Sequence, residues 1–335
     1  MAKKRILTGI TPTGVPHIGN YIGMYKPALA RQDSEHEALY FIADYHSLVK
    51  CWEPQARQDF IYQVAASWLA LGLDPNKTVF YRQSQVPEIA ELSWILSTVA
   101  AKGLLNRAHA YKDQVAKNTE AGEDPDHAIT MGLFCYPVLM AADILAFNAN
   151  LVPVGKDQAQ HMEIARDIAA RFNHVYGETF VLPEALIDDT TPTLPGLDGR
   201  KMSKSYGNTI PLFEPANRLR KLVMKIKTNS QPPEEPKETE GCTLFEIYRA
   251  FASESEVADI KKRYTQGIGW GEMKQILFEK LDQELSGPRE KYEALIQDTA
   301  GIQKILDQGA QKARDLAAPI FKNVYRNTGL IKGTS

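Results

Sequence analysis

The chain has 335 residues, of which 44% are hydrophobic and 24% are charged, the composition of an ordinary soluble globular protein. This length suffices for one large domain and a smaller one. The net charge of −2 does not indicate nucleic-acid binding through bulk charge, so such a partner would require a local basic face. No apolar stretch is long enough for a signal peptide or a membrane span, so we expect a cytoplasmic protein without membrane contact.

Three cysteines, Cys51, Cys135 and Cys242, lie far apart in the sequence. No two of them have metal or redox spacing, and their odd number argues against a disulfide framework. We therefore expect buried structural thiols. No other cluster of metal ligands stands out, so the sequence predicts no metal site built from side chains.

Strand and helix patterns alternate in the first part of the chain. Apolar runs predict strands at residues 5–9, 38–43, 78–81 and 151–154. Helical patterns fall between and after them, at residues 20–31, 54–72, 88–101, 104–110, 131–147 and 157–172. This alternation predicts an α/β fold with a doubly wound parallel sheet.

Two later regions have a different character. Residues 113–127 are polar and are interpreted as a mobile loop, from which Lys112 and Lys117 could reach phosphate or RNA, or simply face solvent. After residue 205 the pattern is helical, with a basic helix at 215–227 and a proline-rich, acidic segment at 231–241. We expect that segment to be a solvated loop.

The turn after the first strand has features of a phosphate site. Residues 9–20 (GITPTGVPHIGN) join a strand to a helix through glycines and prolines, a geometry that aims backbone N–H groups at an anion. Gly19 would let a base or ribose lie against the helix start. His17 could donate to a phosphate oxygen, although a histidine in such a turn can equally be structural.

A second element of this kind is the segment 199–208 (GRKMSKSYGN). Lys201 and Lys204 lie three positions apart beside hydroxyl side chains and between glycines, and mobile lysines can follow a shifting phosphate. Alone, the segment could be a solvated basic turn. Two such elements at one sheet edge imply a nucleoside triphosphate, and no Walker motif is present. The pattern favours in-line attack of a carboxylate on the α-phosphorus, with His17, Lys201 and Lys204 as catalytic groups and Mg²⁺ on the pyrophosphate.

A further set of residues predicts a small-molecule pocket. Asp143 lies in apolar surroundings and shares a helix face with Tyr136 and Met140. His46 and Gln158 follow predicted strands, at the sheet edge where ligands bind. A buried carboxylate requires a donor, which a ligand could supply. Asp143 could instead cap a nearby backbone, and His46 could begin or cap a helix.

Several of these motifs match a known family. The pair PHIGN (16–20) and KMSKS (201–205) resembles the signature of class I aminoacyl-tRNA synthetases, with Asn20 in place of the family's last histidine. The stretches GNYIG, YPVLMAADIL and VPVGKDQAQHMEIARDIAARFN resemble tryptophanyl-tRNA synthetases in particular. The resemblance implies a Rossmann-like, HUP-type catalytic domain at 1–205 and a helical anticodon-binding domain at 206–300. It also implies a C-terminal helix at about 302–335 that packs back on the catalytic domain, and a homodimer.

The resemblance also implies a reaction and its residues. L-Tryptophan reacts with ATP to give tryptophanyl-adenylate and pyrophosphate, and tryptophan then passes to the 3′-terminal adenosine of tRNA(Trp). Asp143 accepts the indole N–H, in a pocket completed by His46, Tyr136, Met140 and Gln158. ATP contacts are implied for Thr11, Pro12, Thr13, Gly19, Asn20, Gly155, Lys156, Asp157, Leu194, Lys201, Met202, Ser203, Lys204 and Ser205.

Three alternatives stay open at this point. A tyrosyl-tRNA synthetase shares the fold and also uses a buried aspartate. A small-molecule nucleotidyltransferase would need no C-terminal helical domain. A non-catalytic paralogue that senses tryptophan or RNA would not need His17, Lys201 or Lys204.

Overall fold

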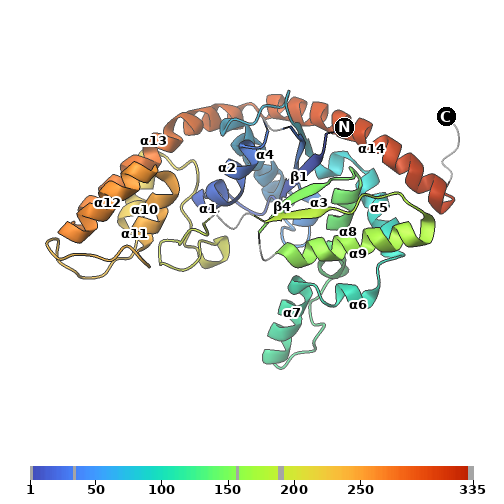
Figure 1. Ribbon diagram of the computed structural model, residues 1–335, viewed down its shortest axis with the longest axis horizontal. Coiled ribbons are helices and arrows are strands. Elements are labelled where there is room, and N and C mark those ends of the chain that lie inside the picture. The colour runs from blue at the N-terminus through green and yellow to red at the C-terminus, as the bar shows by residue number, and fades with distance from the viewer. Residues whose placement is uncertain (1–2, 33–34, 156–157, 188–191, 331–335) are drawn as a thin grey trace.

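Five parallel strands form the sheet at the centre of the structure (Figure 1). The computed structural model describes residues 3–32, 35–155, 158–187 and 192–330. The strands are β1 (Arg5–Ile10), β2 (Glu37–Ile42), β3 (Val79–Arg82), β4 (Leu151–Val154) and β5 (Glu184–Ile187), in the spatial order β3-β2-β1-β4-β5. The predicted α/β fold with a parallel sheet is confirmed. The sequence did not predict β5, because this edge strand buries no residue and lacks an apolar run.

Helices cover both faces of this sheet. Those of the first part are α1 (Ile18–Asn20), α2 (Lys26–Leu29), α3 (Asp44–Ser47), α4 (Pro54–Ala70), α5 (Glu88–Ser97), α6 (Lys102–Leu105), α7 (His109–Glu120), α8 (Met131–Leu145) and α9 (Ala159–Tyr176). Alternate residues of β2 enter two cores: Tyr40 packs with Trp68 of α4 on one face, and Phe41 joins side chains of α5, α8 and α9 on the other. Both faces are therefore buried, which explains the continuous apolar strand pattern.

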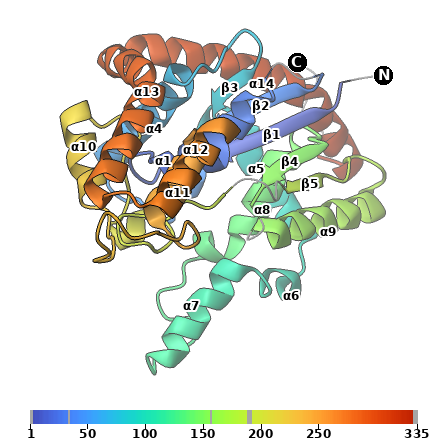
Figure 2. The same ribbon diagram turned by 60° about the vertical axis from the view of Figure 1, so that its left-hand side comes forward.

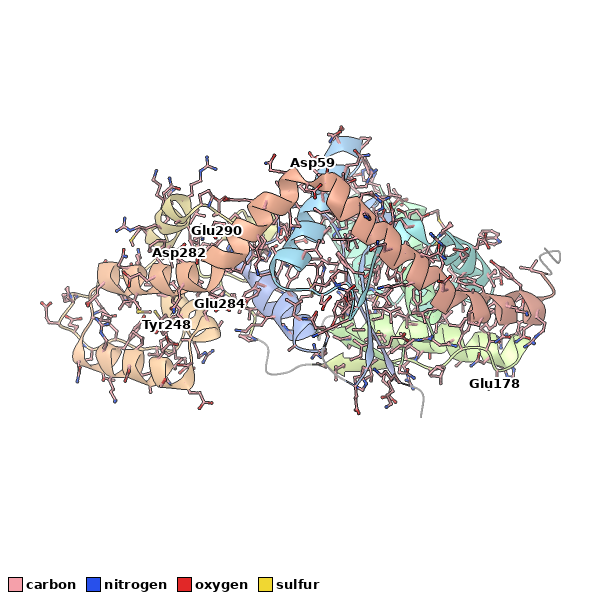
Figure 3. The ribbon with its side chains drawn as sticks, turned by 90° about the horizontal axis from the view of Figure 1, so that it is seen from above. Asp59, Glu178, Tyr248, Asp282, Glu284 and Glu290 are labelled. Carbon is pink, nitrogen blue, oxygen red and sulfur yellow. The ribbon has the colours of Figure 1, made fainter. Side chains whose placement is uncertain are left out.

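The later part of the chain is helical in the described residues. It contains α10 (Ala216–Met224), α11 (Thr243–Phe251), α12 (Glu254–Gln266), α13 (Trp270–Gln297) and α14 (Thr299–Thr328). The first four gather at one end of the molecule, and α14 runs along the sheet domain (Figure 1). Seen from above, α13 and α14 meet at an angle near Asp59 of α4 (Figure 3).

Helix α14 lies directly against β3. A Cβ atom placed on Gly309 would be 1.7 Å from the carbonyl oxygen of Phe80. Ala310, Ala313 and Ala317 are also buried in this contact region. Small side chains therefore allow the two backbones to approach.

The predicted loop at residues 113–127 is wrong over its first half, because α7 continues to Glu120. This helix is polar on nearly all sides and projects from the body of the molecule in both views (Figures 1 and 2). It has no apolar stripe for a core, so the periodicity that signals a helix is missing. The segment after it is held by Asn118, whose Nδ2 donates to the carbonyl oxygens of Pro125 and His127 at 2.9 and 2.8 Å.

The cysteines are unpaired, as the sequence predicted. All three are half-buried rather than buried, so that part of the prediction is wrong. Within the described residues, no helix is both long and apolar enough to cross a membrane.

Candidate active site

A cavity of about 350 Å³ opens at the carboxyl edge of the sheet, beside β1 and β4. The strand order changes direction between these two strands, and ligands of open α/β sheets bind at such a point. The lining residues are Leu7, Gly9, Thr11, Phe41, Ala43, His46, Tyr136, Met140, Asp143, Ile144, Val152, Pro153, Val154, Gly155 and Gln158. The structure thus brings the five residues predicted for the amino-acid pocket together with Thr11 and Gly155.

Asp143 is the buried acceptor of this cavity, with 1% of its surface exposed. Its Oδ1 accepts a hydrogen bond from the Gln83 amide at 2.7 Å, and its Oδ2 lies 2.8 Å from His46 Nε2. Burial raises the pKa of Asp143, whereas the contacts with His46 and Gln83 oppose that rise. Because each carboxylate oxygen has two lone pairs, Asp143 can accept a further hydrogen bond from a ligand.

Aromatic rings form the wall beside this acceptor. Tyr136 meets His46 edge to face with ring centroids 5.1 Å apart, and it meets His161 in the same way at 5.0 Å. The Tyr136 hydroxyl lies 3.4 Å from Gln158 Oε1 and 3.9 Å from Met140 Sδ. An apolar wall next to one buried acceptor suits a flat aromatic ligand that carries a single N–H donor.

His17 caps the first turn of α1. Its Nδ1 accepts from the Asn20 backbone N–H at 3.3 Å, and the Asn20 side-chain oxygen accepts from the His17 backbone N–H at 3.1 Å. Because Nδ1 is an acceptor, the ring proton resides on Nε2. Burial, aided by the positive charge of Lys204, lowers the pKa of His17 to about 4. The ring is therefore neutral at pH 7 and has one N–H to donate.

Asn20 thus has a structural contact of its own. It completes a capping box with His17, as a polar residue at the third helical position often does. The position at which the chain departs from the usual signature therefore supports the turn that holds His17. Gly19 lies between them, and a Cβ there would be only 2.9 Å from His17 Nδ1.

The lysine motif begins within a short antiparallel pairing of backbone segments. Met202 N–H donates to the Leu194 carbonyl at 2.9 Å, and Gly196 N–H donates to the Arg200 carbonyl at 2.7 Å. Leu194 and Met202 are buried, whereas Lys201 is exposed. The pairing therefore anchors one side of the loop in the core and leaves the Lys201 side chain accessible.

Asn208 holds the other side of this loop from within. Asn208 is buried, with 3% of its surface exposed. Its Oδ1 accepts a hydrogen bond from the Ser203 N–H at 2.9 Å. Its Nδ2 donates to the Asp198 carboxylate at 2.7 Å and to the Lys201 carbonyl at 3.2 Å. The bond from Asn208 is the main reason that the pKa of Asp198 falls to about 2. One buried amide therefore fixes the backbone around both lysines.

The two motifs touch through Lys204. Its Nζ donates to the carbonyl oxygen of Gly14 at 2.8 Å. The residue as a whole is exposed, but its ammonium group lies against this turn, and the loss of water there lowers the pKa of Lys204 to about 8. Gly14 has a φ of +144° and would bring a Cβ within 3.3 Å of that ammonium group, so glycine suits the position.

Backbone pairing joins the same two segments. Ile18 N–H donates to the Ile210 carbonyl at 3.0 Å, and Leu212 N–H donates to the Pro16 carbonyl at 2.9 Å. The segment that follows the lysine loop, residues 210–212, therefore lies beside the turn that carries His17. This contact brings the two sequence motifs to one place.

The remaining predicted ATP residues fall around these loops. Pro12 is buried, and Thr13 N–H donates to the Thr11 carbonyl at 3.0 Å. Ser203 and Ser205 share a hydrogen bond between their hydroxyls at 2.8 Å. Lys156 and Asp157 lie outside the described residues.

Sequence reasoning missed two residues of this region, Gln83 and Asn208. Both are buried amides that hold other site groups in place. Gln83 directly follows β3, so the rule that ligands bind at the carboxyl edge of the sheet could have drawn attention to it. For Asn208 the sequence offers only its closeness to the lysine motif.

The two loops and the cavity thus lie at one edge of the sheet, and comparison with known proteins gives the class. The model of the family "tRNA synthetases class I (W and Y)" matches residues 2–286. The chain belongs to this family.

Individual relatives narrow the assignment. The tryptophan–tRNA ligase of Pseudomonas aeruginosa is 56% identical over 330 residues, which are 97% of this chain and 74% of the relative. That of Neisseria meningitidis is 54% identical over 332 residues, covering 98% of this chain and 99% of the relative. The tryptophanyl-tRNA synthetase of Campylobacter jejuni, solved with ADP and tryptophan, is 44% identical, covers 97% of this chain and 99% of its own, and superposes with a TM-score of 0.88. Within the class, the chain belongs to the tryptophan–tRNA ligases.

The function predicted from the motifs is thereby confirmed, in preference to tyrosine activation. The chain is an ATP-dependent aminoacyl-tRNA ligase. It activates L-tryptophan with ATP to tryptophanyl-adenylate and pyrophosphate, and then transfers tryptophan to the 3′-terminal adenosine of tRNA(Trp).

Proposed function

We propose that the cavity at the sheet edge binds tryptophan, with Asp143 accepting the indole N–H. The observation that carries this assignment is a buried carboxylate with spare lone pairs in an otherwise largely apolar cavity. A ligand without an N–H at that point would leave the acceptor unpaired, which costs binding energy. Selection by such a hydrogen bond can reach about 10⁴–10⁵ against an analogue that lacks the donor.

The rest of the tryptophan site follows from its neighbours. Tyr136 and Gln158 both line the cavity with polar atoms 3.4 Å apart, and we assign them to the α-ammonium group. Met140 and His46 line the same cavity and would contact the indole faces. The substrate carboxylate would then point toward the loop after β1, where the nucleotide binds.

For the first step, we assign ATP to the joined loops above the cavity. The substrate carboxylate oxygen attacks the α-phosphorus, a new P–O bond forms, and the bond to the pyrophosphate oxygen breaks. His17 donates from Nε2 to a phosphate oxygen, while Lys201 and Lys204 stabilise negative charge that grows on the leaving pyrophosphate. The proposed ATP contacts are Thr11, Pro12, Thr13, Gly19, Asn20, Gly155, Lys156, Asp157, Leu194, Lys201, Met202, Ser203, Lys204 and Ser205. Asn20 would act through its backbone, since its side chain is bonded to His17.

Mg²⁺ would enter with the nucleotide. Among the described residues, no group of three or more His, Cys, Asp or Glu side chains could hold a metal ion. The residues therefore do not form a cage for Mg²⁺, which would keep phosphate and water oxygens as its ligands. We assign no step to it.

We propose that residues 206–300 read the tRNA anticodon and that residues 1–205 catalyse, with the C-terminal helix belonging to the catalytic part. Basic side chains on α10 and directly after it support the first assignment: Arg218, Arg220, Lys221 and Lys225 are all exposed. Contacts between α14 and β3 support the last. A basic face binds phosphates, which gives affinity without sequence information.

A homodimer in the cytoplasm completes the proposal. Trp94 on α5 exposes 74% of its surface, and Met131 at the start of α8 exposes 70%. These helices pack on each other, so large apolar side chains lie exposed on neighbouring elements. Such residues are enriched at protein interfaces. Sedimentation should give a dimer for the wild type and a monomer for Trp94→Arg; a wild-type monomer would reject this part.

The experiment that tests the site is exchange of labelled pyrophosphate into ATP. Tryptophan should support exchange, while tyrosine and phenylalanine should not. Alanine at Tyr136 should raise KM for tryptophan more than KM for ATP, and alanine at Thr13 should do the reverse. Equal effects on both substrates would contradict the proposed division of the site.

A further inference from the structure

Gln83 is a fully buried side chain behind the tryptophan cavity. It is the first residue of the short 3₁₀ turn η2 (Gln83–Gln85), directly after β3, and none of its surface is exposed. It does not line the cavity itself. Any effect that it has on a ligand must therefore pass through a neighbouring group.

The hydrogen bonds of Gln83 fix the orientation of its amide. Its Oε1 accepts from the backbone N–H of Tyr45 at 3.0 Å. The amide nitrogen must then face the other way, where it donates to Asp143 Oδ1 at 2.7 Å. An amide held in this manner can only donate to Asp143 and cannot accept from it. It also ties together three elements, since Tyr45 is on α3 and Asp143 on α8.

His46 is the second hydrogen-bond partner of Asp143 and also holds the carboxylate in place. His46 Nε2 lies 2.8 Å from Oδ2, and its other ring nitrogen, Nδ1, is buried and has no hydrogen-bond partner among the described residues. With Gln83 on one oxygen and His46 on the other, the plane of the carboxylate cannot turn without breaking a buried hydrogen bond. Loss of a buried partner is unfavourable because the group left behind has no water to replace it.

We propose that Gln83 is a positioning residue for tryptophan selection, because its amide orients the Asp143 carboxylate toward the indole N–H. The proposal rests on the assignment of Asp143 as the indole acceptor. Asp44 also affects this carboxylate, since its negative charge disfavours the ionised form of Asp143. A donor at Gln83 offsets that influence and keeps the carboxylate an acceptor on both oxygens.

The test is Gln83→Met. Methionine has a similar length but has no N–H, and it adds no carboxyl group that could take up a proton and donate it to Asp143. Gln85→Met is the matched control, because Gln85 lies in the same turn and its amide donates to Asp307 at 2.5 Å, away from the cavity. Pyrophosphate exchange is measured with tryptophan and with its benzothiophene analogue, in which sulfur replaces the indole N–H.

Wild-type enzyme should prefer tryptophan over the analogue by about 10²-fold or more in kcat/KM. Gln83→Met should lower this preference about 10-fold, through a higher KM for tryptophan, with kcat and the constants of the analogue nearly unchanged. Gln85→Met should keep the wild-type preference. Should Gln83→Met fail to fold, Gln83→Leu removes the same donor without adding charge and carries the same expectation.

The outcomes distinguish the role of Gln83 from the role of Asp143 as the indole acceptor. An unchanged preference in a folded Gln83 variant would overturn the role of Gln83 while leaving Asp143 as the acceptor. Equal losses for tryptophan and the analogue would indicate a purely structural role and would also overturn it. A wild-type enzyme that does not distinguish the two substrates would remove Asp143 from indole recognition, and the Gln83 proposal with it.

Discussion

Lys204 donates from Nζ to the carbonyl oxygen of Gly14 at 2.8 Å, and the two residues are 190 positions apart in the chain. An ammonium group has three donors, so this contact leaves others for a ligand. The contact also brings a positive charge to the turn between β1 and α1, where helix N-terminal N–H groups favour anions. The lysine loop is therefore already joined to the turn that we propose for nucleotide binding.

Replacing Lys204 with methionine should affect the chemical step more than substrate binding. Its charge meets the phosphates most strongly when the pyrophosphate leaves, and only interactions that strengthen in the transition state raise kcat. We expect the tryptophan-dependent exchange rate to fall about 10²–10³-fold, with the Kd for tryptophan changed less than about two-fold. Lys221→Met, at an exposed lysine on α10, is the control and should change neither. A weakened Kd with an unchanged rate would contradict the assignment.

The pH dependence of ATP use should follow Lys204. Its pKa is lowered to about 8 before the nucleotide binds, and the charged form is required, so kcat/KM for ATP should fall as pH rises through about 8. His17, with a pKa of about 4, is neutral throughout this range and adds no inflection. Arginine stays charged, so Lys204→Arg should lose the inflection even if its activity is lower. An identical profile in that variant would assign the inflection to another group.

Much of this site could be predicted because its residues follow local rules. Asp143 stood out as a carboxylate in an apolar helix, and Tyr136 and Met140 shared its face. His46 and Gln158 were identified by their positions after strands, and parallel strands end at one edge. The structure brings all five to one cavity, although their roles toward tryptophan stay predictions.

The parts that could not be predicted depend on contacts made only after folding. Asn208 and Gln83 act through hydrogen bonds of buried amides, which form only when the chain has folded, and no periodicity marks such residues. Lys237 is similar: it lies in the segment interpreted as solvated, yet it is 4% exposed and donates to the Pro232 carbonyl at 2.7 Å. A lysine can be buried this way because the folded loop turns its own carbonyls toward the ammonium group.

Replacing Asp143 with asparagine should weaken the choice of tryptophan over phenylalanine. Asparagine keeps the size of the side chain but loses its charge, and its amide group must donate on one side. We expect the ratio of kcat/KM for tryptophan to that for phenylalanine to fall about 10–100-fold in pyrophosphate exchange. Asp282→Asn is the control, since Asp282 also bonds a buried partner, Arg289 at 2.9 Å, but lies on α13 and does not line the cavity. Unchanged selection in the Asp143 variant would remove this residue from the pocket.

Two glycines in the last helices should respond to alanine in opposite directions. In a free helix, alanine is about 1 kcal/mol better than glycine. At Gly271 of α13 a Cβ meets nothing within 4 Å, so Gly271→Ala should raise Tm slightly. At Gly309 of α14 a Cβ would lie 1.7 Å from the Phe80 carbonyl oxygen, so the helix must move away from β3.

The Gly309 variant should therefore lose stability despite its better helix propensity. Overpacking of a close contact costs about 1–3 kcal/mol, and here backbone rather than a flexible side chain blocks the way. Scanning calorimetry of both variants beside the wild type gives the comparison. A Tm for Gly309→Ala equal to that of Gly271→Ala would show that α14 tolerates a wider separation from β3. The expected result is a lower Tm for Gly309→Ala alone, because only there does the added methyl group meet the backbone of another element.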